Sequence, residues 1–365
     1  MQKLKSAYIF LLVIWMLCHL VFSVPVSAQS SLIQEKFNFS NKKTAVLVWW
    51  PNLEKDFWIN GGWPQILKDG FEKKGYQFIL THEHSKDFEE LISKSDTIIV
   101  ACPLFQKKYV FGSKVNPLSK VYIWALESPL NLHQPIQIPS VVPLKKIFTW
   151  RTDLVDNITT FYIPVETRLE QPVNINTDPS NKQIFLIQIA GNHYKNSSVG
   201  AIYEKRRQAT LWWLKNHPDA YEFYGVGWTN LLKDADKTLK KKFKSRYKGY
   251  TPDKIKTLSQ AYYALAFENT RHPDYVSEKI YDVMKAGTVP IYLGAPNIEE
   301  FVPKDCFINY ADFKNDEALY EYLISVTPTE YQNYLSCIQN FMASDKINSL
   351  TARNTGIILL KEIFE

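Results

Sequence analysis

The chain has 365 residues, which is too long for one ordinary α/β core and suggests two domains behind an amino-terminal leader. Hydrophobic residues make up 45% and aromatic residues 14% of the composition, so the chain can build packed cores and is not of the intrinsically disordered class. The formal net charge of +6 is mild, fits an anionic ligand or an ordinary solvated surface equally well, and gives no reason to expect a nucleic-acid partner.

The first thirty residues, 1–30, are predicted to be a targeting segment. Lys3 and Lys5 precede the apolar run 7–22, and residues 26–28 (Val-Ser-Ala) offer a small-residue cleavage site. A cleaved signal peptide and a short uncleaved signal-anchor both fit, because the run is slightly shorter than the ~20 apolar residues that span a bilayer. In either case we expect the body of the protein to lie across a membrane from the cytosol.

Beyond the leader, short apolar runs alternate with amphipathic stretches. Strands that are apolar on both faces are typical of a parallel sheet covered by helices. In the first half we expect strands at 44–50, 76–80, 97–102, 121–126, 147–150 and 160–163, and helices at 63–74 and 88–93. The polar stretch 171–182 carries two prolines and no periodicity, and it is the predicted linker.

The same alternation continues through the second half. Strands are expected at 184–190, 223–226, 262–267 and 288–293, and helices at 203–216, 277–286, 319–323, 331–341 and 355–364. The lysine-rich run 240–248 indicates a solvated loop or helix face, with an anion-binding patch as the alternative. The pattern predicts an α/β protein with two Rossmann-like domains in series, residues 31–175 and 176–345, followed by a carboxyl-terminal helix in residues 346–365.

The stretch 262–313 is the most informative part of the chain. A buried strand ends in Glu268, a polar loop follows, and a helix begins at Ser277 with Glu278 and Lys279 in its first turn. Such a βαβ unit holds ligands at the carboxyl ends of its strands, where a helix N-terminus favours phosphate. Lys279 supplies a point charge and Glu278 can accept from a hydroxyl, so the arrangement suits a nucleotide sugar. The alternative interpretation is a solvent-facing lysine beside an acidic residue favoured by the helix dipole.

Four cysteines are present, and Cys18 lies in the leader. The other three, Cys102, Cys306 and Cys337, form no CxxC pair, so neither a zinc site nor a disulfide framework is predicted. Cys102 and Cys306 lie in apolar, strand-like contexts and are expected to be buried thiols. The Asp-Ala-Asp triplet at 234–236 lies in a lysine-rich, helix-prone segment, so we expect no obligatory metal.

Residues 267–308 carry a specific set of motifs. The segments FENTRHPDYVSEK, AGTVPIYLGAPN and FVPKDCFI resemble the signature of the α1,3/α1,4-fucosyltransferases, glycosyltransferase family 10, over about fifty positions. Upstream, WALESP resembles the Glu-Ser-Pro segment of that family, and FTWRTD resembles its Tyr-Arg-Arg-Asp segment more loosely. In total the resemblance covers residues 120–315.

The resemblance implies a glycosyltransferase-B fold, in which the second domain binds GDP-fucose and the first holds the acceptor sugar. It implies an inverting transfer of L-fucose to a hydroxyl of an oligosaccharide or glycoconjugate, with O3 of N-acetylglucosamine as the expected position. No cofactor is obligatory, and a divalent metal is at most a stimulant. The short anchor of many members implies membrane attachment if the leader stays uncleaved, on the Golgi lumen side in a eukaryote and in the periplasm or cell envelope of a bacterium.

Glu127 matches the carboxylate proposed as general base in the family. It ends a predicted strand immediately before Ser-Pro, so its side chain can project from the carboxyl edge of the first sheet. The alternative is a carboxylate that caps a turn or pairs with a lysine. Trp49, Trp50 and Trp63 near the end of the first strand are interpreted as core residues, with a platform for a sugar ring as the alternative.

The family's donor-binding positions also transfer to this chain. The resemblance implies that Arg207 neutralises phosphate and that Lys279 lies against the diphosphate. It implies that Glu278 accepts hydrogen bonds from the ribose, and that Asn269 and Tyr275 contact the nucleotide or the fucose.

Two departures from the family pattern leave alternatives open. The segment between Ala190 and Arg206 is longer than in the family, so Arg206 is an alternative match for the phosphate arginine. The disulfide-forming cysteines of animal members are missing, which indicates a divergent or bacterial branch. The rival functions are a transferase that uses another nucleotide sugar and a catalytically silent glycan-binding protein of the same fold.

Overall fold

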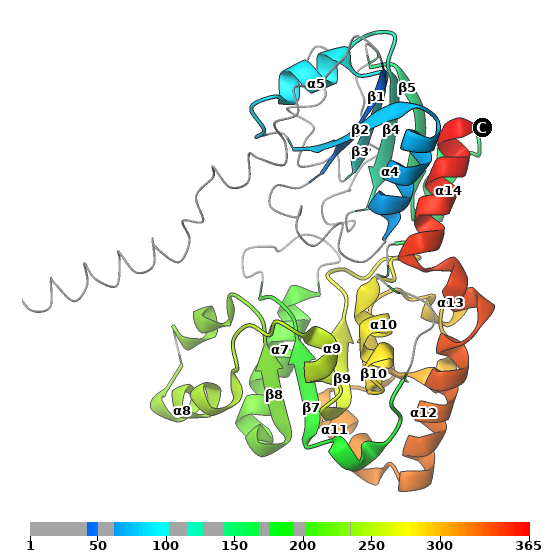
Figure 1. Cartoon of the computed structure of the whole chain (residues 1–365). Coiled ribbons are helices and arrows are strands. Elements are labelled where there is room, and N and C mark those ends of the chain that lie inside the picture. Colours follow the sequence, from blue (N-terminus) through cyan, green and yellow to red (C-terminus); the bar gives the residue numbers. More distant parts are fainter. Residues whose placement is uncertain are drawn as a thin grey trace, which may run out of the picture. The chain divides into compact units, whose positions relative to one another are not determined.

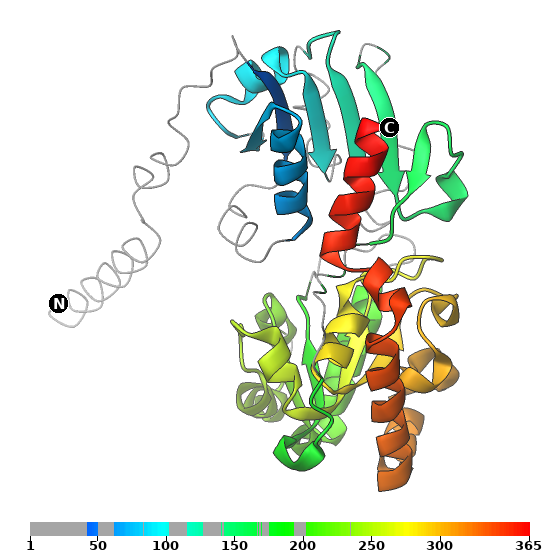
Figure 2. The same cartoon turned by 45° about the vertical axis from the view of Figure 1, so that its right-hand side comes forward.

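The computed structural model describes residues 42–49, 62–82, 84–101, 115–126, 140, 142–165, 167, 169, 175–192, 202–233 and 235–365. The chain divides into two units, residues 1–42 and 43–365, and every helix and strand of the described residues belongs to the second. The predicted leader, Trp50, Cys102 and Glu127 lie outside the described residues. Figure 1 and Figure 2 show two sheets flanked by helices.

The first sheet has six strands, all parallel, in the order β2-β1-β3-β4-β5-β6. Its strands are β1 (Lys43–Val48), β2 (Tyr76–Thr81), β3 (Thr97–Ala101), β4 (Lys120–Ala125), β5 (Leu144–Thr149) and β6 (Thr160–Tyr162). Helices α4 (Trp63–Lys73) and α5 (Phe88–Lys94) follow β1 and β2. The apolar runs therefore predicted these strands to within three residues at each end, because strands buried on both faces read as continuous hydrophobic segments.

The core of the first sheet is aromatic. Trp63 begins α4, is 1% exposed and packs edge-to-face against Trp49 and Trp124, with ring centroids 5.2 and 4.6 Å away. Trp49 is 6% exposed. The interpretation of Trp49 and Trp63 as core residues is confirmed, and neither ring is open to a sugar.

The carboxyl-terminal helix packs on this sheet. Both views show α14 (Ala352–Phe364) beside α4 (Figure 1, Figure 2). The rings of Phe71 and Phe364 lie 4.8 Å apart, and the hydroxyl of Tyr122 donates to the carbonyl of Ile363 at 3.0 Å. The chain therefore returns to the first sheet after completing the second.

The second sheet has five strands, again all parallel, in the order β11-β10-β9-β7-β8. They are β7 (Ile184–Ile189), β8 (Tyr221–Tyr224), β9 (Ala261–Phe267), β10 (Val289–Leu293) and β11 (Ile308–Asn309). The helices of this half are α7 (Tyr203–Asn216), α8 (Lys237–Arg246), α9 (Lys254–Leu258), α10 (Glu278–Lys285), α11 (Asp316–Ser325), α12 (Pro328–Met342) and α13 (Asp345–Ser349). Single 3₁₀ turns lie at Thr152–Leu154, Pro179–Asn181, Pro218–Ala220, Trp228–Leu232, Ile298–Glu300, Lys304–Cys306 and Tyr310–Asp312.

Most of the lysine-rich run 240–248 lies in α8, which agrees with the prediction of a solvated helix face. Asp236 caps α8 by accepting from the N–H of Leu239 at 2.7 Å, and Phe243 is the residue of α8 that is buried. The lysines at 237, 240, 241 and 244 are exposed. The helix is therefore amphipathic, with its charged side in solvent.

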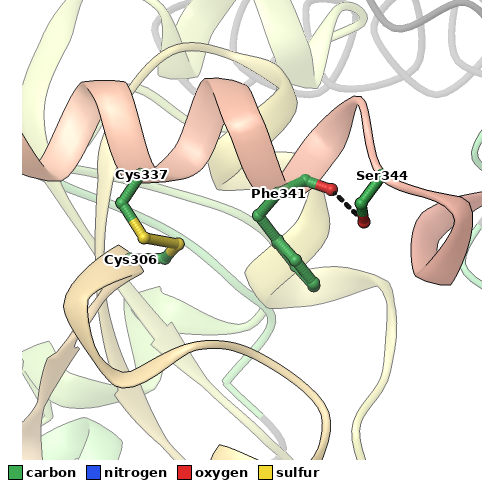
Figure 3. Close-up of a disulfide and its surroundings, with 4 residues drawn as sticks. All are labelled: Cys306, Cys337, Phe341 and Ser344. Carbon is green, nitrogen blue, oxygen red and sulfur yellow. Dashed lines mark hydrogen bonds between the residues drawn. A yellow bond between two sulfur atoms is a disulfide. The ribbon is translucent and has the colours of Figure 1, made fainter.

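A disulfide joins Cys306 to Cys337 across 31 residues. It links the turn before β11 to α12, where Cys337 and Phe341 project from the same side of the helix (Figure 3). The prediction that Cys306 is a buried thiol is wrong, although the residue is fully buried. The two cysteines lie in separate elements, and only the packing of α12 on the turn brings them together.

Among the described residues, none of the helices combines the length and the apolar character that crossing a bilayer requires.

Candidate functional site

The candidate site lies at the carboxyl end of β9, in the second sheet. β9 is an apolar strand, and Glu268 extends it by one residue because its N–H donates to the carbonyl of Leu293 at 2.8 Å. The side chain of Glu268 is fully buried. A carboxylate in such a place needs hydrogen-bond donors or cations around it, because an isolated buried charge is very costly.

Helix α10 supplies those partners. The N-cap residue Ser277 donates its N–H to Glu268 Oε1 at 2.8 Å and its hydroxyl to Glu268 Oε2 at 2.7 Å. The ammonium of Lys279, in the first turn, lies 3.3 Å from the same Oε2 and donates to the hydroxyl of Ser277 at 2.9 Å. The first turn of α10 is therefore joined to the end of β9 through one carboxylate.

The helix is held by its apolar side and by a glycine at its end. Ile280, Val283 and Met284 are buried on one side of the helix. Gly287 has φ +67°, and a Cβ there would lie 2.1 Å from the carbonyl oxygen of Asn176. Only glycine fits this close approach, which fixes where α10 ends and β10 begins.

Opposing effects set the charge of Lys279. Burial lowers the pKa of the ammonium, but the carboxylates of Glu268 and Glu278 more than offset it, so the pKa lies above its ordinary value. Glu278 is half-buried, and its Oε1 is 3.4 Å from the ammonium. Lys279 is thus a fixed, fully charged group at a helix N-terminus, which is a site suited to phosphate.

Arg206 is the second cation of the site, and unlike the half-buried Lys279 it is fully buried. It comes from the first turns of α7, is 2% exposed, and donates to the carbonyls of Phe267 at 2.7 Å, Glu268 at 3.0 Å and Gly191 at 3.0 Å. Its contact with Asn269 Oδ1 is 3.4 Å. Burial lowers the pKa of Arg206, yet a guanidinium stays protonated throughout the physiological range.

Arg207, the predicted phosphate arginine, has a different position. It forms an ion pair with Glu204 on its own helix. The structure therefore brings the alternative match, Arg206, to the end of β9 together with Asn269, Glu278 and Lys279. Which of the two arginines contacts the donor stays a prediction.

The loop 270–274 lies between the two sheets' strand ends. The ring of Tyr275, 5% exposed, lies 5.0 Å from that of Trp150, the residue after β5. Asp274 has φ +67°, and its N–H and carboxylate both bond to the side chain of Asn297, at 2.9 and 2.8 Å. The hydroxyl of Thr152 also donates to the carboxylate of Asp274. Thr152 and Asn297 therefore both bond to Asp274, whose left-handed backbone conformation is uncommon for residues other than glycine.

Two further observations concern predictions for this site. Glu127, the predicted base, lies outside the described residues. Within the described part of the chain, no group of three or more His, Cys, Asp or Glu side chains is arranged to hold a metal ion. Sequence reasoning placed Glu268 at the strand end but gave it no role, although an acidic residue directly after an apolar strand was the available signal.

Comparison of the chain with a protein-family model and with curated proteins gives a consistent result. Residues 205–355 match the family model "Glycosyltransferase family 10 (fucosyltransferase) C-term". The 4-galactosyl-N-acetylglucosaminide 3-alpha-L-fucosyltransferase 9 of Mus musculus is 38% identical over 98 residues, covering 25% of this chain and 27% of that protein. The bovine 3-galactosyl-N-acetylglucosaminide 4-alpha-L-fucosyltransferase FUT3 is 40% identical over 84 residues, covering 22% and 23%. The chain thus matches about a quarter of the length of these curated relatives.

Solved structures extend the likeness to the whole fold. An α1,3-fucosyltransferase with GDP is 18% identical, with a TM-score of 0.50 over 91% of this chain and 93% of that one. Anabaena Alr3699/HepE in complex with UDP and glucose is 10% identical, with a TM-score of 0.55 over 88% and 99%. The predicted fold, two Rossmann-like sheets of the glycosyltransferase-B type, is therefore confirmed.

Proposed function

We propose, from the match of residues 205–355 to the family model of the carboxyl-terminal part of glycosyltransferase family 10, that the chain is an inverting fucosyltransferase that moves L-fucose from GDP-fucose to a hydroxyl of an oligosaccharide. One observation carries the proposal. The family match spans the βαβ unit in which Lys279, in the first turn of α10, pairs with buried Glu268, whose carbonyl accepts from Arg206. The curated relatives of the chain are named as fucosyltransferases.

The donor half of the reaction belongs to this unit. As GDP leaves, negative charge grows on the diphosphate, and fixed cations in a water-poor site stabilise it. Lys279 provides such a cation at the helix N-terminus, and Arg206 or Arg207 provides a second. Glu278, half-buried in the first turn, accepts from the ribose hydroxyls, while Asn269 and Tyr275 contact the nucleotide or the fucose.

The acceptor half needs a base. The acceptor oxygen attacks C1 of fucose while the bond from C1 to the phosphate oxygen breaks, which inverts the anomeric carbon and releases GDP. Glu127 takes the proton of the acceptor hydroxyl, a role that contributes roughly 10²–10⁴-fold to the rate. We propose O3 of N-acetylglucosamine as the position modified, as in the name of the mouse relative, with O4, as in the bovine name, as the alternative. No metal is required for this step, and a divalent ion is at most a stimulant.

The predicted leader and the disulfide both support a proposal for the place of action. Disulfides persist in the secretory pathway and the periplasm and are rare in the cytosol, so the Cys306–Cys337 bond fits a protein that crosses a membrane. We propose that the chain is membrane-associated or exported, on the Golgi lumen side in a eukaryote and in the periplasm or cell envelope of a bacterium.

The test is direct transfer. The purified protein is incubated with GDP-fucose and N-acetyllactosamine, and a mass gain of one deoxyhexose on the acceptor is the expected result. Thermal stabilisation by GDP without product on any acceptor would instead indicate a silent glycan-binding protein. Stabilisation by UDP and not by GDP would overturn the donor assignment.

The role of Glu127 has its own test. Glu127→Gln removes the base but none of the donor contacts, so turnover should fall by roughly 10²-fold or more while GDP affinity is retained. Isothermal titration calorimetry with GDP and a transfer assay measure the two quantities separately. Normal turnover in this variant would remove Glu127 from the mechanism.

A further inference from the structure

Glu268 makes none of the donor contacts proposed above. Ser277, Lys279 and Arg206 nevertheless all contact it. We propose that Glu268 is a positioning residue, whose buried carboxylate holds Ser277 and the ammonium of Lys279 at the start of α10 so that Lys279 meets the donor diphosphate charged and in one place. This inference rests on the proposed function, because it concerns the same donor site.

The hydrogen bonds form a directed chain. Lys279 donates to the hydroxyl of Ser277 at 2.9 Å, and that hydroxyl donates to Glu268 Oε2 at 2.7 Å. The N–H of Ser277 occupies Oε1 at 2.8 Å, and the ammonium itself is 3.3 Å from Oε2. Both oxygens of Glu268 are therefore engaged by the first residues of α10, and their geometry is that of charge-assisted bonds.

The carboxylate is itself held firmly. The N–H of Glu268 donates to Leu293 at 2.8 Å, and its carbonyl accepts from Arg206 at 3.0 Å. A Cβ at Gly294 would lie only 2.5 Å from Glu268 Cγ and 2.2 Å from the hydroxyl oxygen of Tyr292. Glycine at 294 leaves the space that the side chain of Glu268 occupies, so the carboxylate has one position.

Ser277 has an unusual use for an N-cap residue. A serine at this position ordinarily accepts from the N–H groups of the first turn, but the hydroxyl of Ser277 makes no such bond. It is turned toward Glu268 instead. The hydroxyl of Ser277 therefore does not satisfy the first-turn N–H groups, and such groups at a helix N-terminus favour phosphate.

The charge of Lys279 depends on the groups that face it. These are Glu268 at the end of β9, Glu278 on α10 and Arg206 on α7. Burial and Arg206 both favour the neutral amine, and the two carboxylates favour the ammonium, with Glu268 as the stronger. Removing the charge of Glu268 leaves Glu278 alone against burial and Arg206, so the pKa of Lys279 should fall.

The principal variant is Glu268→Gln, which keeps the size of the side chain and removes its charge. We expect GDP binding to weaken roughly tenfold at neutral pH, and to weaken further as the pH rises from ~7 to ~9, whereas the wild-type affinity stays nearly constant. Calorimetric titration with GDP across this range measures both effects. Glu268→Asp keeps the charge and should restore the wild-type pH profile, with a smaller loss of affinity from its shorter reach.

A matched control separates positioning from general damage. Asp316 is another buried carboxylate of the same half of the chain, 6% exposed, and its charge interacts with Lys205 and Tyr310 rather than with Lys279. Asp316→Asn should leave the pH profile of GDP binding unchanged. If Glu268→Gln does not fold, Ser277→Ala tests the same hydrogen bonds. It removes the hydroxyl that links Lys279 to Glu268 but keeps the direct ion pair between those two residues. GDP affinity should then fall a few-fold without a change in pH profile.

A readout without ligand keeps the two proposals distinct. The ¹³Cε signal of Lys279, assigned with Lys279→Arg, should titrate above the ordinary lysine range in the wild type and lower in Glu268→Gln. A wild-type protein that shows this titration but binds no GDP would contradict GDP-fucose as the donor. It would still support the effect of Glu268 on the pKa of Lys279. An ordinary or lowered pKa of Lys279 in the wild type, or unchanged or tighter GDP binding in Glu268→Gln at every pH, would overturn the positioning role.

Discussion

The two sheets share a parallel architecture but differ in what they bury. Among the described residues, the buried polar side chains of the first sheet and its helices are hydroxyls, such as Ser95 and Ser119, whose hydroxyls donate to nearby carbonyls. The buried charged side chains of the described residues all belong to the second half. They are Lys182, Arg206, Glu268 and Asp316.

This difference agrees with the proposal that the end of β9 binds the anionic diphosphate of the donor. Removing an ion from water costs several kcal/mol, and replacing a whole group of buried, mutually bonded charges with apolar residues of similar size is often at least as stable, whereas removing only one partner is destabilising. A sheet that only needs a stable core therefore has no use for buried charge, and the aromatic packing around Trp63 illustrates that solution. Charges that remain buried at one strand end, as Arg206 and Glu268 do, indicate a requirement other than stability.

The largest expected effects come from a matched pair of variants, Arg206→Met and Trp63→Ala. Each should lower the free energy of unfolding by about 3–5 kcal/mol, the first by leaving the carbonyls of Phe267 and Glu268 without their donor and the second by opening a core cavity. Only Arg206→Met should also weaken GDP binding. Urea denaturation and calorimetry measure the two quantities, and wild-type GDP affinity in Arg206→Met would break the contrast between the sheets.

The disulfide gives the next largest effect. Replacing both half-cystines, Cys306→Ala with Cys337→Ala, should destabilise the second half by about 2–4 kcal/mol, because the bond closes a loop of 31 residues in the unfolded chain. Reduction of the wild type with dithiothreitol should reproduce the loss. Hydrogen exchange followed by mass spectrometry should show faster opening in α12 and not in β1, and equal loosening of both would contradict the assignment.

Gly294→Ala tests the tight packing around Glu268. The added methyl would meet Glu268 Cγ at 2.5 Å, so we expect about 1–3 kcal/mol of destabilisation and weaker GDP binding. Gly62→Ala, in the first half, is the matched control. A Cβ there meets Pro64 Cδ at 3.6 Å, which is ordinary contact, so neither stability nor GDP binding should fall. Equal behaviour of the two variants would show that the space at 294 is not needed.

Sequence periodicity predicted most of this fold because both sheets are buried and parallel. α7 has the predicted bounds, Tyr203–Asn216, and β7 and β9 each lie within one residue of theirs. Helices α9 and α13 were missed, because five residues make too few turns to display a 3.6-residue period.

The candidate site was predictable only in part. The first turn of α10 follows from the order strand, polar loop, helix, so Glu278 and Lys279 could be named in advance. The contacts of Arg206 with β9 span about sixty residues of sequence, and no local pattern distinguishes it from Arg207. The disulfide has the same origin, since its cysteines meet only when α12 packs against the turn before β11.

Lys182, like Asp316, is a buried charge away from the end of β9 that the anion-site explanation does not cover, and substitution of Lys182 should give the smallest effect. Its ammonium donates to the carbonyl of Ala261 at 2.9 Å, and no carboxylate of the described residues forms an ion pair with it. Burial lowers the pKa of Lys182 from its ordinary value of 10.5 to about 8. Between these two values the unfolded chain holds a proton that the folded chain has released, so stability rises as the pH increases from about 8 to about 10.5.

Below that window the folded protein carries the charged, partly desolvated ammonium at full cost. Lys182→Met removes this cost but also the hydrogen bonds to the strand ends, so we expect a net gain of about 1 kcal/mol at neutral pH. The melting temperature of the wild type minus that of the variant, measured from pH ~7 to ~10.5, should rise across the window and isolate the single group. A flat difference would mean that Lys182 stays charged when buried, and that the second half tolerates an isolated cation away from the site at the end of β9.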